Sequence, residues 1–177
     1  MNDPTLDATL MTEALTLARQ AFEAGEVPIG AVVVLDGRIV GRGFNQTISS
    51  GDPTAHAEIV AIREAARAVG NYRLTGATLY VTIEPCLMCA GSFVHARIAT
   101  VVFGAHEPRT GALESTVRAG DLPGHNHRFA IVSGVLADDA RTLMQTFFKA
   151  RRNKAADTNG ETLVPDADDA GVDTSQA

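Results

Sequence analysis

Two short segments of the sequence carry side chains that can bind one metal ion together. His56-Ala57-Glu58 precedes Pro85-Cys86-Leu87-Met88-Cys89, and Cys86 follows His56 by 30 positions. Zinc prefers imidazole and thiolate ligands, and three of them leave its fourth position open for water, as in catalytic sites. His56, Cys86 and Cys89 are therefore the predicted ligands of one Zn²⁺ per subunit.

Glu58 distinguishes a catalytic zinc site from a structural one. A structural site closes its coordination shell with four protein ligands, whereas here a carboxylate stands beside the open position. Zinc lowers the pKa of bound water to roughly 7, so that Glu58 can take a proton from it and pass the proton to a leaving group. The pattern predicts hydrolytic replacement of an amine, with Glu58 as the proton shuttle.

The cysteine pair and the histidine each have a simpler explanation when taken alone. A Cys-x-x-Cys segment can be a redox pair, and a single buried histidine is more often a satisfied core residue than a ligand. The combination favours a zinc site, and a folded zinc module without catalysis remains the alternative to an enzyme.

Both segments are predicted to open helices. Pro53 and Thr54 place a helix start next to His56, and Pro85 opens a helix whose first turn holds both cysteines. Cysteines three positions apart on a helix share a face, whereas His56 and Glu58, two apart, reach one site only from the first turn. Two helix amino ends would then face the same cavity and stabilise negative charge there.

Helix and strand patterns alternate along the chain. Apolar residues at helical spacing predict three helices. The first contains Leu10, Ala14, Leu17, Ala18 and Ala21, the second carries Ile59, Ile62, Ala66 and Val69 on one face, and the last carries Ala140, Leu143, Met144 and Phe147 on its inner face. Strand patterns cover residues 29–35, 38–44, 77–83, 100–104 and 129–133. The alternation predicts an α/β fold, a three-layer α/β/α sandwich around one mixed five-stranded sheet.

The net charge of −6 over 177 residues is unevenly distributed. Residues 155–177 contain six acidic residues and no lysine or arginine, so that residues 1–154 are neutral, and residues 97–154 carry nine basic against five acidic side chains. This predicts one folded domain at 1–154 and an acidic disordered tail at 155–177. The tail is either an inert solubilising segment or a competitor for the basic region.

Nothing in the sequence pattern indicates export or a membrane. No apolar run approaches the roughly 20 residues that cross a bilayer, and the first residues lack the basic and apolar blocks of a secretory signal. Two cysteines do not make a disulfide scaffold. We therefore expect a cytoplasmic protein with no membrane partner.

Further blocks accompany the metal-binding pattern: Glu26-Val27-Pro28-Ile29-Gly30-Ala31, Asn45, Asp52-Pro53-Thr54-Ala55-His56-Ala57-Glu58, Asn71-Tyr72-Arg73-Leu74 and Asn126-His127-Arg128. With them the chain resembles the zinc-dependent nucleoside and nucleobase deaminases, and more narrowly the bacterial tRNA-specific adenosine deaminases, from about residue 8 to residue 154. The resemblance implies a cytidine-deaminase-like fold and a homodimer. It also implies a hydrolase of a cyclic amidine C–N bond, which converts the wobble adenosine of an arginine tRNA to inosine.

The resemblance also assigns roles to residues. His56, Cys86 and Cys89 match the zinc ligands and Glu58 the proton shuttle. Asn45 matches a residue that hydrogen-bonds the target nucleotide, and Asn126 one that contacts the anticodon loop. For both asparagines a turn role is the alternative, because asparagine is common in turns.

The basic end of the last predicted helix fits a contact with a tRNA anticodon stem-loop. Phe147 and Phe148 precede Lys149, Arg151, Arg152 and Lys154, and aromatic rings can stack an unpaired base while cations hold phosphates. Phe148, Arg151 and Arg152 are the candidate contacts, whereas Phe147 is better placed for the core. A solvated basic helix end is the alternative.

Two segments depart from the pattern of these deaminases. His106-Glu107 stands where the second position is usually aspartate, and Leu113-Glu114-Ser115 replaces a small-residue Gly-Ser pattern. Glu107 keeps the charge and stays a candidate substrate contact.

A small-molecule deaminase acting on guanine, cytosine or a nucleoside is one alternative function, and a non-catalytic zinc or RNA-binding protein is another. The Asn126-His127-Arg128 block and the basic helix favour tRNA.

Overall fold

The computed structural model describes the backbone of residues 4–160 and the side chains of residues 4–154. Its elements follow the chain in the order α1 (Pro4–Glu23), β1 (Gly30–Leu35), β2 (Arg38–Phe44), α2 (Thr47–Ser50), α3 (Ala57–Val69), β3 (Thr78–Ile83), α4 (Leu87–Ala96), β4 (Thr100–Ala105), the 3-10 turn η1 (Ala119–Asp121), β5 (Ala130–Ser133) and α5 (Ala137–Gly160). Each strand begins and ends within one residue of its predicted bounds. The short elements α2 and η1 were not predicted.

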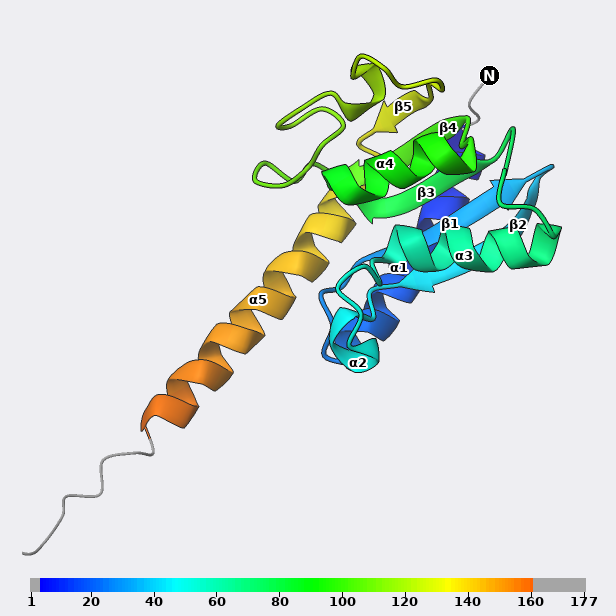
Figure 1. Cartoon of the computed structure of the whole chain (residues 1–177). Coiled ribbons are helices and arrows are strands. Elements are labelled where there is room, and N and C mark those ends of the chain that lie inside the picture. The colour runs from blue at the N-terminus through cyan, green and yellow to red at the C-terminus, as the bar shows by residue number, and fades with distance from the viewer. Residues whose placement is uncertain (1–3, 161–177) are drawn as a thin grey trace, which may run out of the picture.

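The strands form one sheet in the order β2-β1-β3-β4-β5 (Figure 1). β1 pairs antiparallel with both β2 and β3, whereas β3, β4 and β5 run parallel to one another. The predicted mixed five-stranded sheet is confirmed. Because parallel strands end at the same edge, the residues that follow β3 and β4 are neighbours, and the amide of Glu84 donates to the carbonyl of Ala105 at 2.8 Å.

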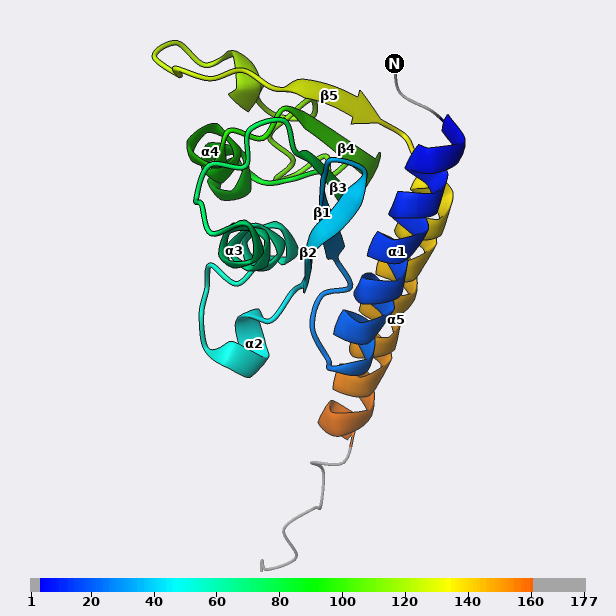
Figure 2. The same ribbon diagram turned by 90° about the vertical axis from the view of Figure 1, so that its right-hand side faces the viewer.

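Helices cover both faces of the sheet. α1 and α5 lie side by side on one face, and α3 and α4 lie on the other (Figure 2). Met11, Val32 and Val102 belong to the core under α1, and Ala61 and Phe93 belong to the core under α3 and α4. Two cores on opposite faces of one sheet confirm the three-layer α/β/α sandwich.

Helix α3 approaches β2 very closely. A Cβ atom at Gly41 would lie 2.2 Å from the carbonyl oxygen of Ala61, and one at Gly43 would lie 2.3 Å from that of Ala57. Only glycine fits at these two strand positions, and only small residues fit on the helix face opposite them. This contact fixes the start of α3, where the predicted metal ligand His56 lies.

The apolar face that helical spacing marks on α3 is not its most deeply buried face. The fully buried face consists of Ala57, Ala61 and Ala65, whereas Ile59 and Ile62 are only partly buried and Val69 is 39% exposed. The face that the spacing marks carries the larger side chains Ile59, Ile62 and Val69 and is less buried. The close approach of the strand leaves no room for branched side chains, so the sheet buries alanines instead.

Helix α5 continues six residues past the predicted end of the folded domain. Its backbone is helical from Ala137 to Gly160, whereas the sequence pattern predicted that residues 155–160 belong to a disordered tail. The rest of the predicted acidic tail, residues 161–177, lies outside the described residues. Ala140 and Phe147 are buried on the inner face of α5, as predicted.

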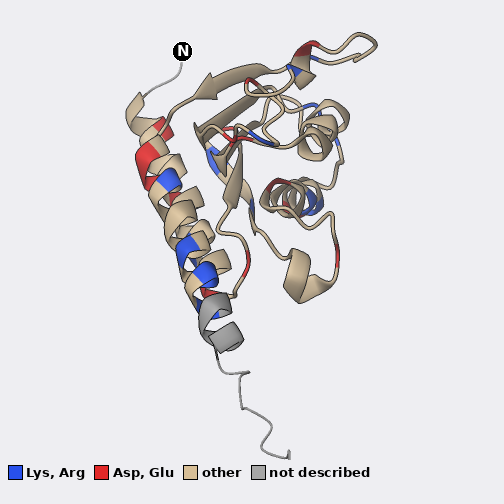
Figure 3. Cartoon of the chain, turned by 90° about the vertical axis from the view of Figure 1, so that its left-hand side faces the viewer, with Lys and Arg blue, Asp and Glu red and all other residues tan. Residues whose placement is uncertain are grey.

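The charge along α5 changes sign. Asp138 and Asp139 lie in its first turn, and Lys149, Arg151 and Arg152 lie on later turns (Figure 3). The acidic pair lies at the helix end whose dipole favours negative charge, whereas the basic residues lie in the middle of the helix, before its last turn. Among residues 4–160, no helix combines the length and the apolar character needed to cross a membrane.

Candidate metal centre

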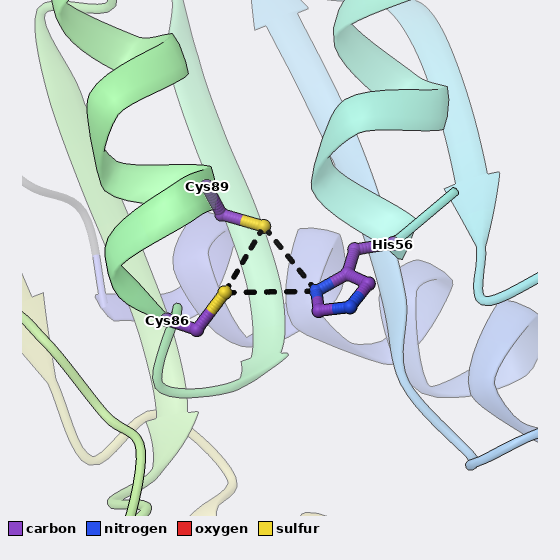
Figure 4. Close-up of side chains that lie close together, drawn as sticks. All are labelled: His56, Cys86 and Cys89. Atoms are coloured by element: carbon purple, nitrogen blue, oxygen red, sulfur yellow. Dashed lines mark hydrogen bonds between the residues drawn. The ribbon is translucent and has the colours of Figure 1, made fainter. Parts of the chain in front are cut away.

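The predicted ligands come from the amino ends of two neighbouring helices. His56 is the N-cap of α3, and Cys86 is the N-cap of α4, with Cys89 in the first turn of α4 (Figure 4). The helices therefore begin after His56 and Cys86, later than the predicted starts at Thr54 and Pro85. An N-cap residue has extended backbone, which lets its side chain turn into the space between the two helices.

The three ligand atoms form a triangle of the size that zinc requires. Nδ1 of His56 lies 3.7 Å from Sγ of Cys86 and 3.5 Å from Sγ of Cys89, and the two sulfur atoms are 3.7 Å apart. Tetrahedral zinc with Zn–S bonds of about 2.3 Å and Zn–N bonds of about 2.0 Å separates sulfur from sulfur by about 3.8 Å and sulfur from nitrogen by about 3.5 Å. The residues present fit a zinc ion.

The two thiols of the centre differ strongly in acidity. Hydrogen bonds from the Cys89 thiol and from His56 lower the pKa of Cys86 to about 4, against the effect of burial. The interaction with Cys86, together with burial, raises the pKa of Cys89. A second thiolate would repel the first at 3.7 Å, and a divalent cation between them offsets that repulsion. The pair is therefore suited to hold a metal.

Glu58 lies in the first turn of α3 and is only 3% exposed. Burial raises the pKa of its carboxyl, although the hydrogen bond to its own amide and the contacts with His56 and Cys89 act in the opposite direction. The structure thus brings Glu58 to the ligands from the first turn of α3, the place that their two-residue spacing requires. The raised pKa moves this carboxyl in the direction that helps it to accept a proton and release it again.

Asn45 directly follows β2 and is buried beside the centre. Its Oδ1 accepts a hydrogen bond of 2.9 Å from the amide of Ala57, the first residue of α3. Its own amide donates to the carbonyl of Ile29 at 3.1 Å. The side chain therefore caps the helix that carries Glu58.

A cavity of about 440 Å³ lies between α5 and the loop that follows β4. We call residues 106–116 the substrate loop. The cavity brings together three predicted substrate contacts, Glu107 of this loop with Phe148 and Arg152 of α5, and its lining is Glu107, Arg109, Met144, Gln145, Phe148 and Arg152. Arg109 was not predicted, although its place two residues after Glu107 was the signal that could have found it. We call this cavity the loop–helix pocket.

Asn126 and Arg151 do not line the loop–helix pocket. Nη1 of Arg97, the C-cap residue of α4, donates to the carbonyl oxygen of Asn126 at 3.0 Å and to its Oδ1 at 2.9 Å. Asn126 is therefore held by the residue that ends α4, whereas Cys86 and Cys89 lie at the start of that helix. The guanidinium of Arg151 lies 5.7 Å from the ring of Phe147.

Two buried carboxylates next to the site were missed in the sequence, Glu26 and Glu84. Glu26 accepts hydrogen bonds from the amides of Ile48 and Ser49 at 2.9 and 2.7 Å and so holds the segment after Asn45. Burial alone would raise the pKa of both carboxyls, but hydrogen bonds from neighbouring amides and hydroxyls hold each pKa below its usual range. The sequence signal that could have identified both carboxylates is an acidic residue inside an apolar block.

Comparisons with known proteins agree with this site. Residues 4–105 match the model of the cytidine and deoxycytidylate deaminase zinc-binding region. A tRNA-specific adenosine deaminase of Haemophilus influenzae is 48% identical over 149 residues, which cover 84% of this chain and 86% of that protein. A second tRNA-specific adenosine deaminase, of Bacillus subtilis, is 44% identical over 150 residues and covers 85% of this chain and 93% of its own length.

A solved structure shows the same architecture. It comes from work on A-to-I editing by tRNA:A34 deaminases at the wobble position of transfer RNA. It matches with a TM-score of 0.75 and 47% sequence identity, over 76% of this chain and 98% of that chain. The likeness therefore shows the same fold over most of the chain.

Proposed function

This chain belongs to the family of zinc-dependent cytidine and deoxycytidylate deaminases, and we propose that it converts the wobble adenosine of an arginine tRNA to inosine. Its fold is cytidine-deaminase-like, and its cofactor is zinc. The observation that carries the choice of substrate is the loop–helix pocket, which combines an exposed aromatic ring with arginines. An anticodon loop offers unstacked bases and phosphates that match both.

Glu58 is proposed to move the protons of the reaction. Zinc, when bound by His56, Cys86 and Cys89, lowers the pKa of a water molecule to about 7. Glu58 accepts a proton on a carboxylate oxygen as the water oxygen bonds to C6 of adenine and passes this proton to N1, and it then moves the remaining hydroxyl proton to the exocyclic nitrogen. The C–N bond breaks, so one water is consumed and one ammonia is released for each inosine formed.

The surroundings of Glu58 favour this chemistry. The amino ends of α3 and α4 both face the ligands, and their dipoles stabilise the negative charge that develops on the reacting atoms. Since Oδ1 of Asn45 is bonded to Ala57, its NH₂ group is the one proposed to donate to the target nucleotide.

The anticodon loop is proposed to bind between the substrate loop and α5. Phe148 is 41% exposed and can stack on a base, while Arg109 and Arg152 can hold phosphates. Glu107 can accept a hydrogen bond from a ribose or a base. Asn126 and Arg151 lie outside this pocket, and we propose that they contact more distant nucleotides of the same stem-loop.

We propose a homodimer formed through the outer face of α3 and α4. The larger apolar side chains of α3 line a shallow cavity of about 330 Å³ between the two helices, with Ile59, Ile62, Arg63, Ala66, Tyr72, Ser92, His95 and Ala96 around it. Tyr72 is 65% exposed. An apolar face of this kind marks an interaction site, and a second copy can cover it under two-fold symmetry.

Ile62→Glu tests the homodimer, because it places a charge at the centre of this face. We expect sedimentation to shift from dimer to monomer while the zinc content is unchanged. A wild-type chain that sediments as a monomer would contradict the proposal.

The proposed site of action is the cytoplasm, where a reducing environment keeps the ligand cysteines as thiols.

Deamination assays on matched substrates test the proposed function. The purified protein should release ammonia from an arginine tRNA anticodon stem-loop with adenosine at the wobble position, and inosine should appear there. The same stem-loop with guanosine at that position is the control. Turnover of free guanine, cytosine or nucleosides alone would indicate a small-molecule deaminase. Binding of the stem-loop without turnover would indicate a non-catalytic RNA-binding protein.

A further inference from the structure

Glu84 lies at the junction between β3 and the metal-binding turn, and the mechanism above does not use it. It follows the last residue of β3 and is separated from the ligand Cys86 only by Pro85. Only 3% of its surface is exposed. A carboxylate buried at this depth costs free energy unless hydrogen bonds compensate for the lost water.

The substrate loop supplies those hydrogen bonds. Oε1 of Glu84 accepts from the amides of Leu113, Glu114 and Ser115 at 3.0, 2.8 and 2.9 Å. Oε2 accepts from the amide of Glu107 at 3.1 Å and from the hydroxyl of Ser115. Three successive amides that converge on one oxygen form an anion-binding nest. One carboxylate therefore binds both ends of the loop.

The same loop also contacts the backbone beside the metal ligands. The amide of Ala112 donates to the carbonyl of Pro85 at 2.8 Å, and Gly111 pairs with Cys86 in an isolated β-bridge. A Cβ atom on Gly111 would lie 2.4 Å from Oε2 of Glu84, so no larger residue fits there. The loop is packed directly against the turn that carries Cys86.

The position of the loop in turn determines the loop–helix pocket. Glu107 and Arg109 line that pocket, and the Glu107 amide is one of the groups bonded to Glu84. The amide of Arg109 donates to Oε1 of Glu107 at 3.0 Å, so the Glu107 side chain is tied to the backbone of Arg109. A change at Glu84 would therefore reach the pocket through the backbone of Glu107.

We propose that Glu84 is a positioning residue that holds the substrate loop, with Glu107 and Arg109, at a fixed place relative to the metal ligand Cys86. It acts through the loop and does not touch the substrate. The inference rests on the proposed function, because the loop selects a substrate only if RNA binds in the loop–helix pocket.

Glu84→Gln tests this role with little change in shape. The glutamine oxygen can still accept from the amides of residues 113–115, but its NH₂ group then faces the amide of Glu107, which also donates. We expect faster hydrogen exchange at Glu107 and in the rest of the substrate loop, with one zinc per chain retained. The KM for the stem-loop should rise about tenfold, the size expected for loss of a charged hydrogen bond, while kcat changes little.

Asp7→Asn is the matched control. Asp7 is a second buried carboxylate, bonded by the hydroxyl of Tyr80 at 2.7 Å on the opposite face of the sheet. Its substitution should lower the melting temperature but leave both the KM and the exchange of the substrate loop unchanged. Ser115→Ala removes only the hydroxyl bond to Glu84, and it should reproduce the effects of Glu84→Gln at smaller size if that variant does not fold.

Loss of zinc from Glu84→Gln, unchanged exchange in the loop, or an unchanged KM would each overturn the proposal. Exchange and zinc content are measured without substrate, so they judge the loop contact even if the wild-type chain does not deaminate the stem-loop. That last result would count against the proposed function and not against the role of Glu84 in holding the loop.

Discussion

The metal centre and the loop–helix pocket are built from different kinds of structure. His56, Cys86 and Cys89 project from two helix ends, and their ligand atoms all lie within 4.8 Å of one another. The close packing of α3 against β2 fixes one of those helix ends. In the pocket, by contrast, the side chains come from a loop and from the outer face of α5, and Phe148 is 41% exposed.

This difference separates the residues that carry out the reaction from the residues proposed to select the substrate. Substituting a residue of the metal centre disturbs a buried set of groups that share charge and hydrogen bonds, so that the reaction itself is lost. Substituting an exposed residue of the pocket removes contacts with the substrate but leaves the core as it was. Substitutions in the two regions should therefore differ both in the size of the effect and in the kinetic constant that changes.

The largest effect is expected at Cys89, which is fully buried. Cys89→Ser replaces a thiolate ligand with a hydroxyl that does not ionise near neutral pH, so zinc and all measurable deamination should be lost. Metal analysis of the purified variant, together with inosine formation on the stem-loop, measures both. Removal of zinc from the wild-type chain with a chelator should give the same loss. A variant that keeps zinc and activity would exclude Cys89 from the ligand set.

Glu58→Gln should separate metal binding from catalysis within the centre. The variant keeps the size of the side chain but cannot carry the proton, so kcat should fall by about 10²- to 10⁴-fold. Zinc content and the Kd for the stem-loop should stay as in the wild-type chain, since Glu58 is not a ligand. If kcat remained within a few fold of the wild-type value, another group would have to carry the proton.

Phe147 and Phe148 are adjacent in α5 and allow the comparison within one helix. Phe148→Ala should raise the KM for the stem-loop about five- to hundredfold through loss of base stacking, with little change in melting temperature. Phe147 is 4% exposed and packs edge-to-face on Phe22 at a ring distance of 5.4 Å. Phe147→Ala should cost about 3 kcal/mol or more of stability through the cavity it leaves.

Kinetics on the stem-loop and thermal unfolding of both variants decide this prediction. An unchanged KM in Phe148→Ala would mean that the exposed ring is only part of a solvated helix surface. A large loss of stability in the same variant would show that Phe148 belongs to the core instead. Either result would remove the distinction between a buried inner face and a substrate-binding outer face of α5.

The sequence alone was sufficient to predict those features that depend on residues close together in the chain. His56, Cys86 and Cys89 could be predicted because ligand type, spacing and helix starts all lie in short segments, and the five strands could be predicted from alternation and turn residues. The inner face of α3 could not, because the partner of a helix face depends on Gly41 and Gly43 in another element. Hydrophobic spacing shows that a face is apolar but not what covers it.

The role of Glu84 was out of reach for the same reason. Its hydrogen bonds join residues that are 23 to 31 positions apart. Most of the donors are backbone amides, which nearly every residue type has, so the sequence of the loop does not indicate them. The loop–helix pocket also depends on distant segments, since Glu107 and Phe148 meet only after α5 has packed onto the sheet. Long-range backbone contacts are the part of the site that composition and spacing do not reveal.

Deletion of residues 161–177 is expected to have the smallest effect. The segment contains five acidic residues and no basic ones, so its removal changes the net charge from −6 to −1. No predicted ligand or substrate contact is removed, so kcat should be unchanged. Because Arg109 and Arg152 are proposed to attract phosphates, loss of these anions should strengthen stem-loop binding about two- to fivefold at low salt, and high salt should screen the difference.

Stem-loop affinity as a function of salt concentration measures this effect in both chains. A gain at low salt that vanishes at high salt would mean that the acidic residues act only through long-range charge, as the uneven distribution of charge in the sequence predicts. Weaker binding after the deletion would show that the segment contributes contacts of its own to the RNA complex. The surface for substrate selection would then extend beyond the substrate loop and α5.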